Sequence, residues 1–332
     1  MNDKEQKTAS SLFSQCGFRQ EGATYRIEAS CVLQGNLPKL ETKQVVDLLR
    51  NDIIGRSEVY QPFEMSYRYY GSTPTFATNT PNILDSSTTS QQTLAKLAKQ
   101  GNEISFTKTE LARYRANQLA FYVSEKDLSL LSRCNTQNYT LALQRIDGYL
   151  LKPGTSFNAN RELAKVKGYC TGRGEKNFLF YGGVCGMTAQ VFRTTIIHPN
   201  IAILKRHPHN ERFVQYYGEN AGGDDAAIYE LSKQFEIKNT GDYDIYFKVK
   251  WLGSGTQLVA ISPRTAQRVE ITKHPISELK IDLERTIRTK EETENTISPF
   301  FPFSTIQTEN TDQPLQTETF SSTYLRKNYE TR

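Results

Sequence analysis

Apolar positions in the first part of the chain follow helical spacing. Between residues 39 and 54 they recur three or four residues apart, which predicts a helix. A second helix is predicted over residues 107–122, because Thr107 and Glu110 have the spacing of a capping box. The stretch between these helices, residues 71–92, is crowded with Ser, Thr, Asn and Pro and is predicted to be a long loop.

After residue 139 the predicted elements become shorter. Residues 141–150 indicate a short helix that ends near a Pro-Gly turn. The sequence Gly-Gly-Val-Cys at residues 182–185 is expected to open a further helix, which buries one apolar face as far as Ile197. A strand is expected to follow this helix over residues 201–204.

The last part of this region alternates apolar and polar residues. Residues 235–238, 243–251 and 258–261 have the alternation of antiparallel strands, and turn residues separate them at 239–242 and 253–255. A hairpin or meander is therefore predicted. An additional strand is expected to begin near Asp225 and to include Tyr229.

These patterns predict an α+β fold with a mainly antiparallel sheet and a helix that starts at the Gly-Gly-Val-Cys sequence. We divide the 332 residues into a mixed N-terminal domain of unknown type (1–125), a second domain (126–280) and a tail (281–332). The tail is rich in Thr, Ser and Glu and poor in apolar residues. Such a composition does not offset the entropy of ordering, so the tail is predicted to be disordered.

Charge and composition exclude several functions. The 41 basic and 36 acidic residues leave a net charge of +5 without a long basic run, so no nucleic-acid partner is expected. No segment approaches the ~20 apolar residues of a transmembrane helix, and residues 1–15 lack the apolar core of a signal peptide. That criterion alone predicts a cytoplasmic location. No metal or cofactor is expected, because the cysteines form no CxxC pair.

The five cysteines allow two interpretations. In an oxidising compartment, Cys16 with Cys31 and Cys134 with Cys170 would close two loops and leave Cys185 unpaired. In a reducing compartment the first four would be ordinary free thiols. The sequence leaves both open.

Cys185 is the candidate nucleophile, because unpaired backbone N–H groups at a helix start favour the thiolate form. His209 is the candidate base that takes the thiol proton, and Asp225 is the candidate acid that orients the imidazole; Asp224 is an alternative to Asp225. The alternative is a non-catalytic interpretation, in which Cys185 is a small buried residue, His209 binds a carbonyl and Asp225 forms a turn or caps a strand.

Other residues near this sequence are candidates for substrate binding. Glycines would cradle the substrate or supply an oxyanion N–H, the arginine would bind a carboxylate, and the remaining side chains would hydrogen bond. The candidates are Gly182, Gly183, Gly186, Thr188, Arg206 and His207. A structural role, such as a tight strand-to-helix connection at the two adjacent glycines, is the alternative for each.

An ordered series of short sequences runs through the second domain. It comprises residues 151–158 (Leu-Lys-Pro-Gly-Thr-Ser-Phe-Asn), 168–169 (Gly-Tyr), 182–185, 206–209, 225–226 and 235–246. In this order, over about residues 135–262, the series resembles the VanW family, which is named for an accessory protein of vancomycin-resistance clusters and is common in bacterial envelope proteins. The family usually has Gln after the cysteine and Ser after the histidine, where this chain has Gly186 and Asn210.

The resemblance implies a role at the cell envelope, with peptidoglycan or a cell-wall peptide as the partner. Joined to the candidate Cys-His-Asp site, it predicts a thiol-dependent amidase or acyltransferase. The alternative is a non-catalytic module that binds cell-wall fragments or a protein partner.

Overall fold

The computed structural model describes residues 19–21, 24–28, 42–48, 68–70, 103–107, 119–175, 178–179, 181–213, 222–263, 265, 267–289 and 314–328. The chain divides into two compact units. One comprises Met1–Ser57, Thr73–Gln118 and Glu291–Thr311, and the other comprises Glu58–Ser72, Leu119–Lys290 and Asp312–Arg332.

The first unit contains a small antiparallel sheet and one helix within its described residues. The sheet has the order β1 (Arg19–Glu21), β2 (Thr24–Glu28), β4 (Glu103–Thr107). Helix α3 (Thr42–Leu48) confirms part of the helix predicted over residues 39–54. The predicted loop at 71–92, and also Cys16 and Cys31, lie outside the described residues.

The helix predicted over residues 107–122 is wrong at both ends. Thr107 is the last residue of β4, and residues 119–122 belong to strand β5 (Leu119–Asp127). β5 lies inside a sheet and pairs along its whole length with β14 (Gly255–Pro263). Its β-branched and aromatic residues suit this position, and the long-range pairing overrides the local capping signal.

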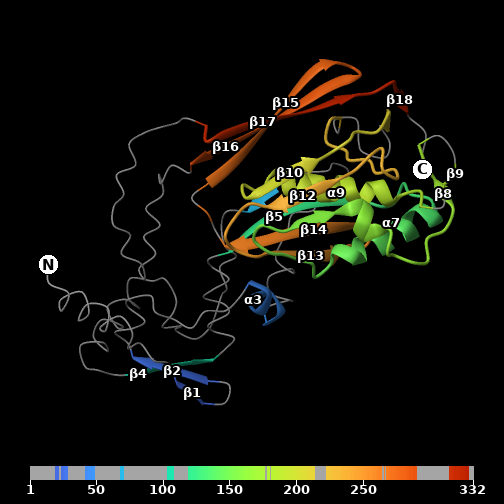
Figure 1. Ribbon diagram of the computed structural model, residues 1–332. Coiled ribbons are helices and arrows are strands. Elements are labelled where there is room, and N and C mark those ends of the chain that lie inside the picture. The colour runs from blue at the N-terminus through green and yellow to red at the C-terminus, as the bar shows by residue number, and fades with distance from the viewer. Residues whose placement is uncertain are drawn as a thin grey trace. The chain divides into compact units, whose positions relative to one another are not determined.

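The main sheet of the second unit has five strands. Their order is β3 (Arg68–Tyr70), β5, β14, β13 (Ile245–Trp251), β6 (Leu150–Leu151), and every neighbouring pair is antiparallel. Two helices, α7 (Arg133–Ile146) and α9 (Val184–Ile196), pack against each other and against this sheet (Figure 1). Within the described residues no helix is long and apolar enough to cross a membrane.

A second antiparallel sheet contains the strand that follows α9 in the chain. It has the order β10 (Ile201–Lys205), β12 (Glu236–Asn239), β7 (Ser156–Asn158), with the short helix α8 (Ala159–Leu163) after β7. A two-stranded pair, β8 (Gly172–Arg173) and β9 (Phe178–Leu179), lies before α9.

The predicted strands of this region are confirmed with two corrections. The turn at residues 253–255 joins a β13–β14 hairpin, but residues 239–242 connect two different sheets and close no hairpin. Residues 225–229 form no strand. They run beside α9 instead, because Thr188 donates a hydrogen bond to the Ala226 carbonyl at 2.6 Å.

Helix α9 lies at the centre of the core. All its residues are buried except Cys185, which is half-buried. Several of its polar side chains form hydrogen bonds inside the protein: Gln190 donates to the carbonyls of Ser124 and Thr256 at 3.1 and 3.3 Å. Because buried polar groups with partners are costly to displace, these bonds hold the helix in a fixed place.

The tail is ordered where the structure describes it. β15 (Gln267–Ser277), β16 (Lys280–Thr289) and β17 (Gln316–Thr323) form an antiparallel sheet, and β18 (Arg326–Asn328) pairs in parallel with β11 (Glu211–Phe213). Disorder was therefore a wrong prediction for residues 281–289 and 314–328, and the predicted boundary at residue 280 falls inside β16.

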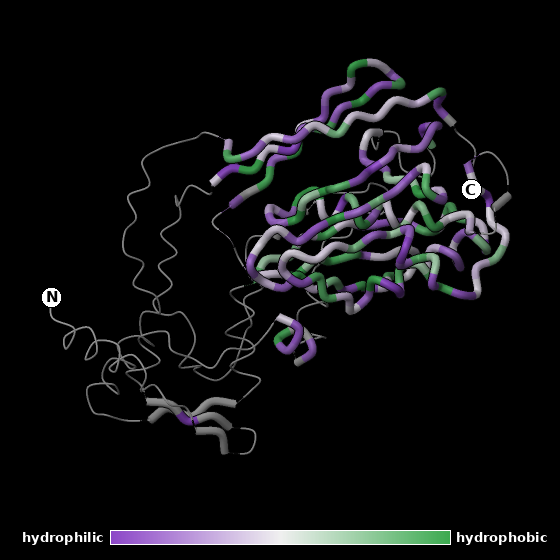
Figure 2. Tube along the Cα trace, viewed as in Figure 1, coloured by the Kyte–Doolittle hydropathy of each residue, from purple (hydrophilic) through white to green (hydrophobic). Residues whose placement is uncertain are grey.

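The tail is ordered because its few apolar residues alternate with polar residues along the strands. Ile281, Leu283 and Ile287 of β16 are buried at 2%, 2% and 4% exposure, and Arg285 on the same face is also buried, while Asp282 and Glu284 are only partly buried. Figure 2 shows the corresponding change between hydrophobic and hydrophilic positions along these strands. A few apolar residues at a spacing of two are enough to bury one face of a sheet.

Candidate active site

Cys185 occupies the first turn of α9. The preceding cap residue, Gly183, has φ +100°, a left-handed conformation that turns the chain sharply into the helix. The sulfur of Cys185 lies 3.5 Å from the amide nitrogen of Ile228, which donates to it, and 3.6 Å from the Ile228 carbonyl. The sequence therefore predicted the position of this thiol at a helix start correctly.

His209 and Asp225 lie together although no regular strand carries either of them. The Asp225 carboxylate accepts hydrogen bonds from His209 through Nδ1 at 2.6 Å and through the backbone N–H at 2.7 Å. Cys185 is also close enough to the His209 ring to raise its pKa. The structure thus brings the three residues of the predicted Cys-His-Asp set together.

The pKa values follow from this arrangement. Burial by itself lowers the pKa of His209, but the hydrogen bond to Asp225 and the nearby Cys185 outweigh burial and raise it to about 9. Burial raises the pKa of Asp225, while His209, Arg206 and Tyr324 together bring it well below its ordinary range. At neutral pH the site therefore contains an imidazolium beside a carboxylate.

The alternative acid, Asp224, has a different partner. Its carboxylate accepts a hydrogen bond from Arg193 of α9 at 2.8 Å, and both side chains are buried. Of the two adjacent acids, one accepts hydrogen bonds from both the ring and the backbone N–H of His209. That residue is Asp225.

Arg206 holds the acid and its loop. Its guanidinium, whose side chain is 3% exposed, donates to the Asp225 carboxylate at 3.3 Å and to the carbonyls of Asp225, Gly223 and Ser321 at 2.7, 2.8 and 3.1 Å. A substrate carboxylate would have to displace these bonds. His207, by contrast, is exposed and contributes its carbonyl, which accepts the Ala227 N–H at 2.7 Å.

The two adjacent glycines make close contacts that exclude side chains. A Cβ at Gly182 would lie 2.5 Å from backbone atoms of Gly172, and one at Gly183 would lie 2.5 Å from the carbonyl oxygen of Asn135. Gly186 donates its N–H to the Gly183 carbonyl at 3.0 Å. In this structure these residues shape the turn, and the Gly186 N–H is engaged within the helix start.

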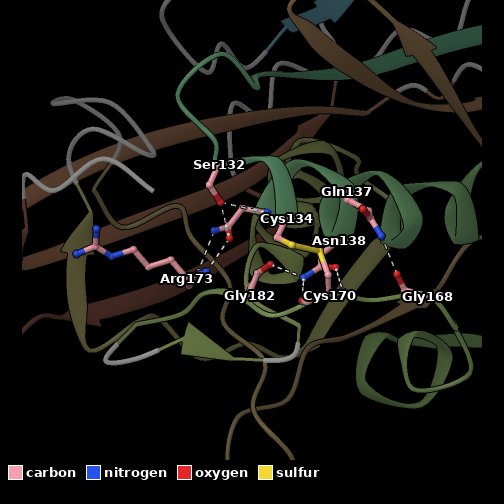
Figure 3. Close-up of a disulfide and its surroundings, with 9 residues drawn as sticks. Ser132, Cys134, Gln137, Asn138, Gly168, Cys170, Arg173 and Gly182 are labelled. Carbon is pink, nitrogen blue, oxygen red and sulfur yellow. Dashed lines mark hydrogen bonds between the residues drawn. A yellow bond between two sulfur atoms is a disulfide. The ribbon is translucent and has the colours of Figure 1, made fainter.

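Helix α7 holds the same turn through residues that the sequence patterns did not single out. Asn138 donates to the carbonyls of Cys170 and Gly182 at 2.7 and 2.9 Å, and Asn135 donates to the Arg173 carbonyl at 3.0 Å (Figure 3). The Cys134–Cys170 disulfide joins α7 to the segment that contains Cys170, which is the pairing expected if the compartment is oxidising. The sequence signal that could have indicated this role is the pair Asn135 and Asn138, about one helical turn apart and next to Cys134.

Charged side chains fix the chain on either side of His209. Glu175 accepts hydrogen bonds from the backbone N–H groups of Asn210 and Glu211, the latter at 2.8 Å. Lys233 donates to the Pro208 carbonyl at 3.0 Å. Neither residue was a candidate from the sequence, because each acts across more than 20 residues of chain.

The described residues contain no cluster of three His, Cys, Asp or Glu side chains that could hold a metal ion. A family model described as VanW like protein matches residues 134–261. No curated protein and no solved structure matches the chain. The match begins at the disulfide cysteine of α7, ends in β14 and includes Cys185, His209 and Asp225. Residues 134–261 of this chain are therefore a VanW-like domain.

Proposed function

We propose that the VanW-like domain uses Cys185 as a nucleophile in acyl transfer or amide hydrolysis. His209 is the proton carrier and Asp225 holds its ring. The single observation that supports this most strongly is the hydrogen bond from His209 to Asp225 with Cys185, the one residue of α9 that is not buried, next to the same imidazole ring. Nucleophile, base and orienting acid in this order are the arrangement of thiol acyl-transfer sites.

The raised pKa of His209 suits the first step. With a pKa of about 9 the imidazole keeps its proton at neutral pH, and the neighbouring thiol is favoured as thiolate. The thiolate attacks the carbonyl carbon of an amide and a C–S bond forms. His209 then gives its proton to the leaving amine as the C–N bond breaks.

The second step needs the opposite proton transfer. After acylation the sulfur carries no charge, so His209 loses one of the two partners that raise its pKa. A neutral imidazole can then take a proton from water or from an acceptor amine, which attacks the thioester. The acyl group leaves as an acid or as a new amide, and the thiolate is restored.

The proposed substrate is an amide bond in a cell-wall peptide. The implied association of the VanW family with the envelope supports this class. The disulfide between Cys134 and Cys170 agrees with it, because such bonds persist mainly in oxidising compartments. In the cell envelope, such peptides are part of peptidoglycan.

The test is the alkylation of Cys185 by iodoacetamide in the wild type and in His209→Ala. An unassisted thiol of pKa ~8.5 is roughly 0.3% ionised at pH 6. A thiolate paired with an imidazolium is a larger fraction of the thiol but reacts more slowly per molecule, so the two effects partly cancel. We therefore expect alkylation to be roughly tenfold slower in His209→Ala at pH 6. At pH 10 the difference should disappear.

Two variants control this experiment. His207→Ala removes an exposed imidazole two residues away and should leave the rate unchanged, while Cys185→Ser measures labelling of other thiols. Equal rates in the wild type and in His209→Ala at pH 6 would contradict the proposal. Release of amine from purified peptidoglycan, abolished in Cys185→Ser, would identify the substrate.

A non-catalytic binding module is the second candidate function. It is favoured by the contacts of the sulfur with the Ile228 backbone and by the engagement of the Gly186 N–H, which leaves that donor occupied. In this case the turn is a structural motif, and the domain binds a cell-wall fragment or a protein partner. Binding of peptidoglycan fragments that persists in Cys185→Ser, without release of amine by the wild type, would favour it.

A further inference from the structure

Tyr324 reaches Asp225 from the far end of the chain. Its hydroxyl donates to Oδ1 of Asp225 at 2.7 Å and accepts the N–H of Gly223 at 2.8 Å. Tyr324 is 4% exposed, and burial followed by the nearby Asp225 raises the pKa of its hydroxyl, which therefore stays protonated. A neutral hydroxyl can donate to the carboxylate at any physiological pH.

The C-terminal segment, residues 314–328, contacts the other parts of the site as well. Leu325 donates its N–H to the Asn210 carbonyl at 2.6 Å, next to His209. Arg326 donates to the Glu211 carboxylate at 3.0 Å, and β18 pairs with β11 in the same place. The segment thus spans the loop of His209 and the loop of Asp225 at once.

We propose that one side chain of the C-terminal segment, Tyr324, is a positioning residue of the active site. The role rests on the proposed function of Cys185, although the segment lies outside the matched residues 134–261. Tyr324 contacts no reacting atom in this assignment. It fixes the carboxylate so that Oδ2 faces Nδ1 of His209.

The geometry of Asp225 explains why such a residue is needed. The carboxylate has two oxygens and can rotate about its bond to Cβ. Oδ2 accepts both bonds from His209, and Oδ1 accepts from Tyr324 and, at 3.3 Å, from Arg206. Arg206 also donates to the backbone carbonyls of Gly223 and Asp225. The shorter of the two bonds to Oδ1 is the one from Tyr324.

The charged groups around His209 come from several elements. Asp225 bonds to the ring, Cys185 lies close enough to raise its pKa, and Arg206 acts through Asp225. Glu175 and Lys233 bond to the chain on either side of the ring. All of them remain in a Tyr324→Phe variant, which removes one hydroxyl and keeps the aromatic ring in the core.

Positioning and simple charge predict opposite shifts. If the hydroxyl only withdrew charge from the carboxylate, its loss would strengthen the bond to His209 and raise the pKa of the imidazole. If it holds the carboxylate in place, its loss lets the carboxylate turn away. The pKa of His209 then falls towards the value that burial alone favours.

The experiment is an NMR titration of the histidine rings in the full chain. The chain has four histidines, and His209→Ala assigns the relevant signal. We expect Tyr324→Phe to lower the pKa of His209 by about one unit. Ser322→Ala is the matched control, because it removes a buried hydroxyl of the same segment that donates to the Gly223 carbonyl at 3.4 Å and does not contact Asp225. In this variant the pKa of His209 should stay at the wild-type value.

An unchanged or raised pKa in Tyr324→Phe, or an equal fall in Ser322→Ala, would overturn the assignment. The titration does not depend on the reactivity of Cys185. A fall in the pKa with an unreactive Cys185 would refute the proposed function while leaving the contact with Asp225 intact. Where both hold, Tyr324→Phe should also slow alkylation of Cys185 at pH 6, with Ser322→Ala at the wild-type rate.

Discussion

Replacing Gly183 with alanine tests whether the turn before Cys185 sets the position of the thiol. Gly183 has φ +100°, where a Cβ is strained, and its Cβ would lie 2.5 Å from the carbonyl oxygen and 2.8 Å from Cα of Asn135. Both atoms belong to the backbone of α7 and cannot move aside as a flexible side chain could. The helix start must therefore shift away from α7.

The magnitude has two parts. A left-handed alanine costs about 1–2 kcal/mol in backbone strain. Ordinary contact begins near 3.4 Å, so the overlap requires a shift of roughly 0.9 Å, and forced repacking of a dense core adds about 1–3 kcal/mol. We expect Gly183→Ala to lower the free energy of unfolding by about 2–5 kcal/mol.

Gly154 provides a matched control. It also has positive φ, +71°, but a Cβ there would meet no atom within 4 Å. Gly154→Ala should therefore lose only the strain, about 1–2 kcal/mol. The assay is urea unfolding of the wild type and both variants, with the rate of Cys185 alkylation at pH 6 measured on the same samples. Equal destabilisation by the two substitutions, or wild-type alkylation in Gly183→Ala, would refute the reasoning.

Two further predictions concern the same domain. Cys134 and Cys170 are 36 residues apart, so loss of their disulfide in Cys134→Ser/Cys170→Ser should lower the free energy of unfolding by about 4 kcal/mol; an unchanged denaturation midpoint would argue against a structural role. Because His209 has a folded pKa of about 9, above the ~6.5 of an unfolded chain, the stability from its protonation is fully present below pH ~6.5 and is lost as the pH rises through 9. The stability difference between the wild type and His209→Gln should accordingly be larger at pH 6 than at pH 9.5, by at most about 3 kcal/mol, and a larger difference at the higher pH would contradict this sign.

Local patterns determined several features of this protein. Helical spacing after the Gly-Gly-Val-Cys sequence predicted α9 with Cys185 in its first turn, and alternation predicted the strands that became β12, β13 and β14. These predictions succeed because the period of apolar residues reflects which face of a single element is buried. The ordered short sequences predicted the VanW-like domain for a similar reason, since they lie within one stretch of chain.

The tertiary structure decided which side chains meet. Asp224 and Asp225 are adjacent and chemically equal in the sequence, and only the position of Arg193 on α9 assigns the first to an ion pair and leaves the second for His209. Tyr324 lies 99 residues from Asp225, in a segment whose polar composition predicted disorder. Contacts over such separations leave no periodic trace, because they depend on how strands pair and where loops cross rather than on the neighbours of each residue. The sequence therefore determined the position of Cys185 at the start of its helix, and the fold determined which side chains lie around it.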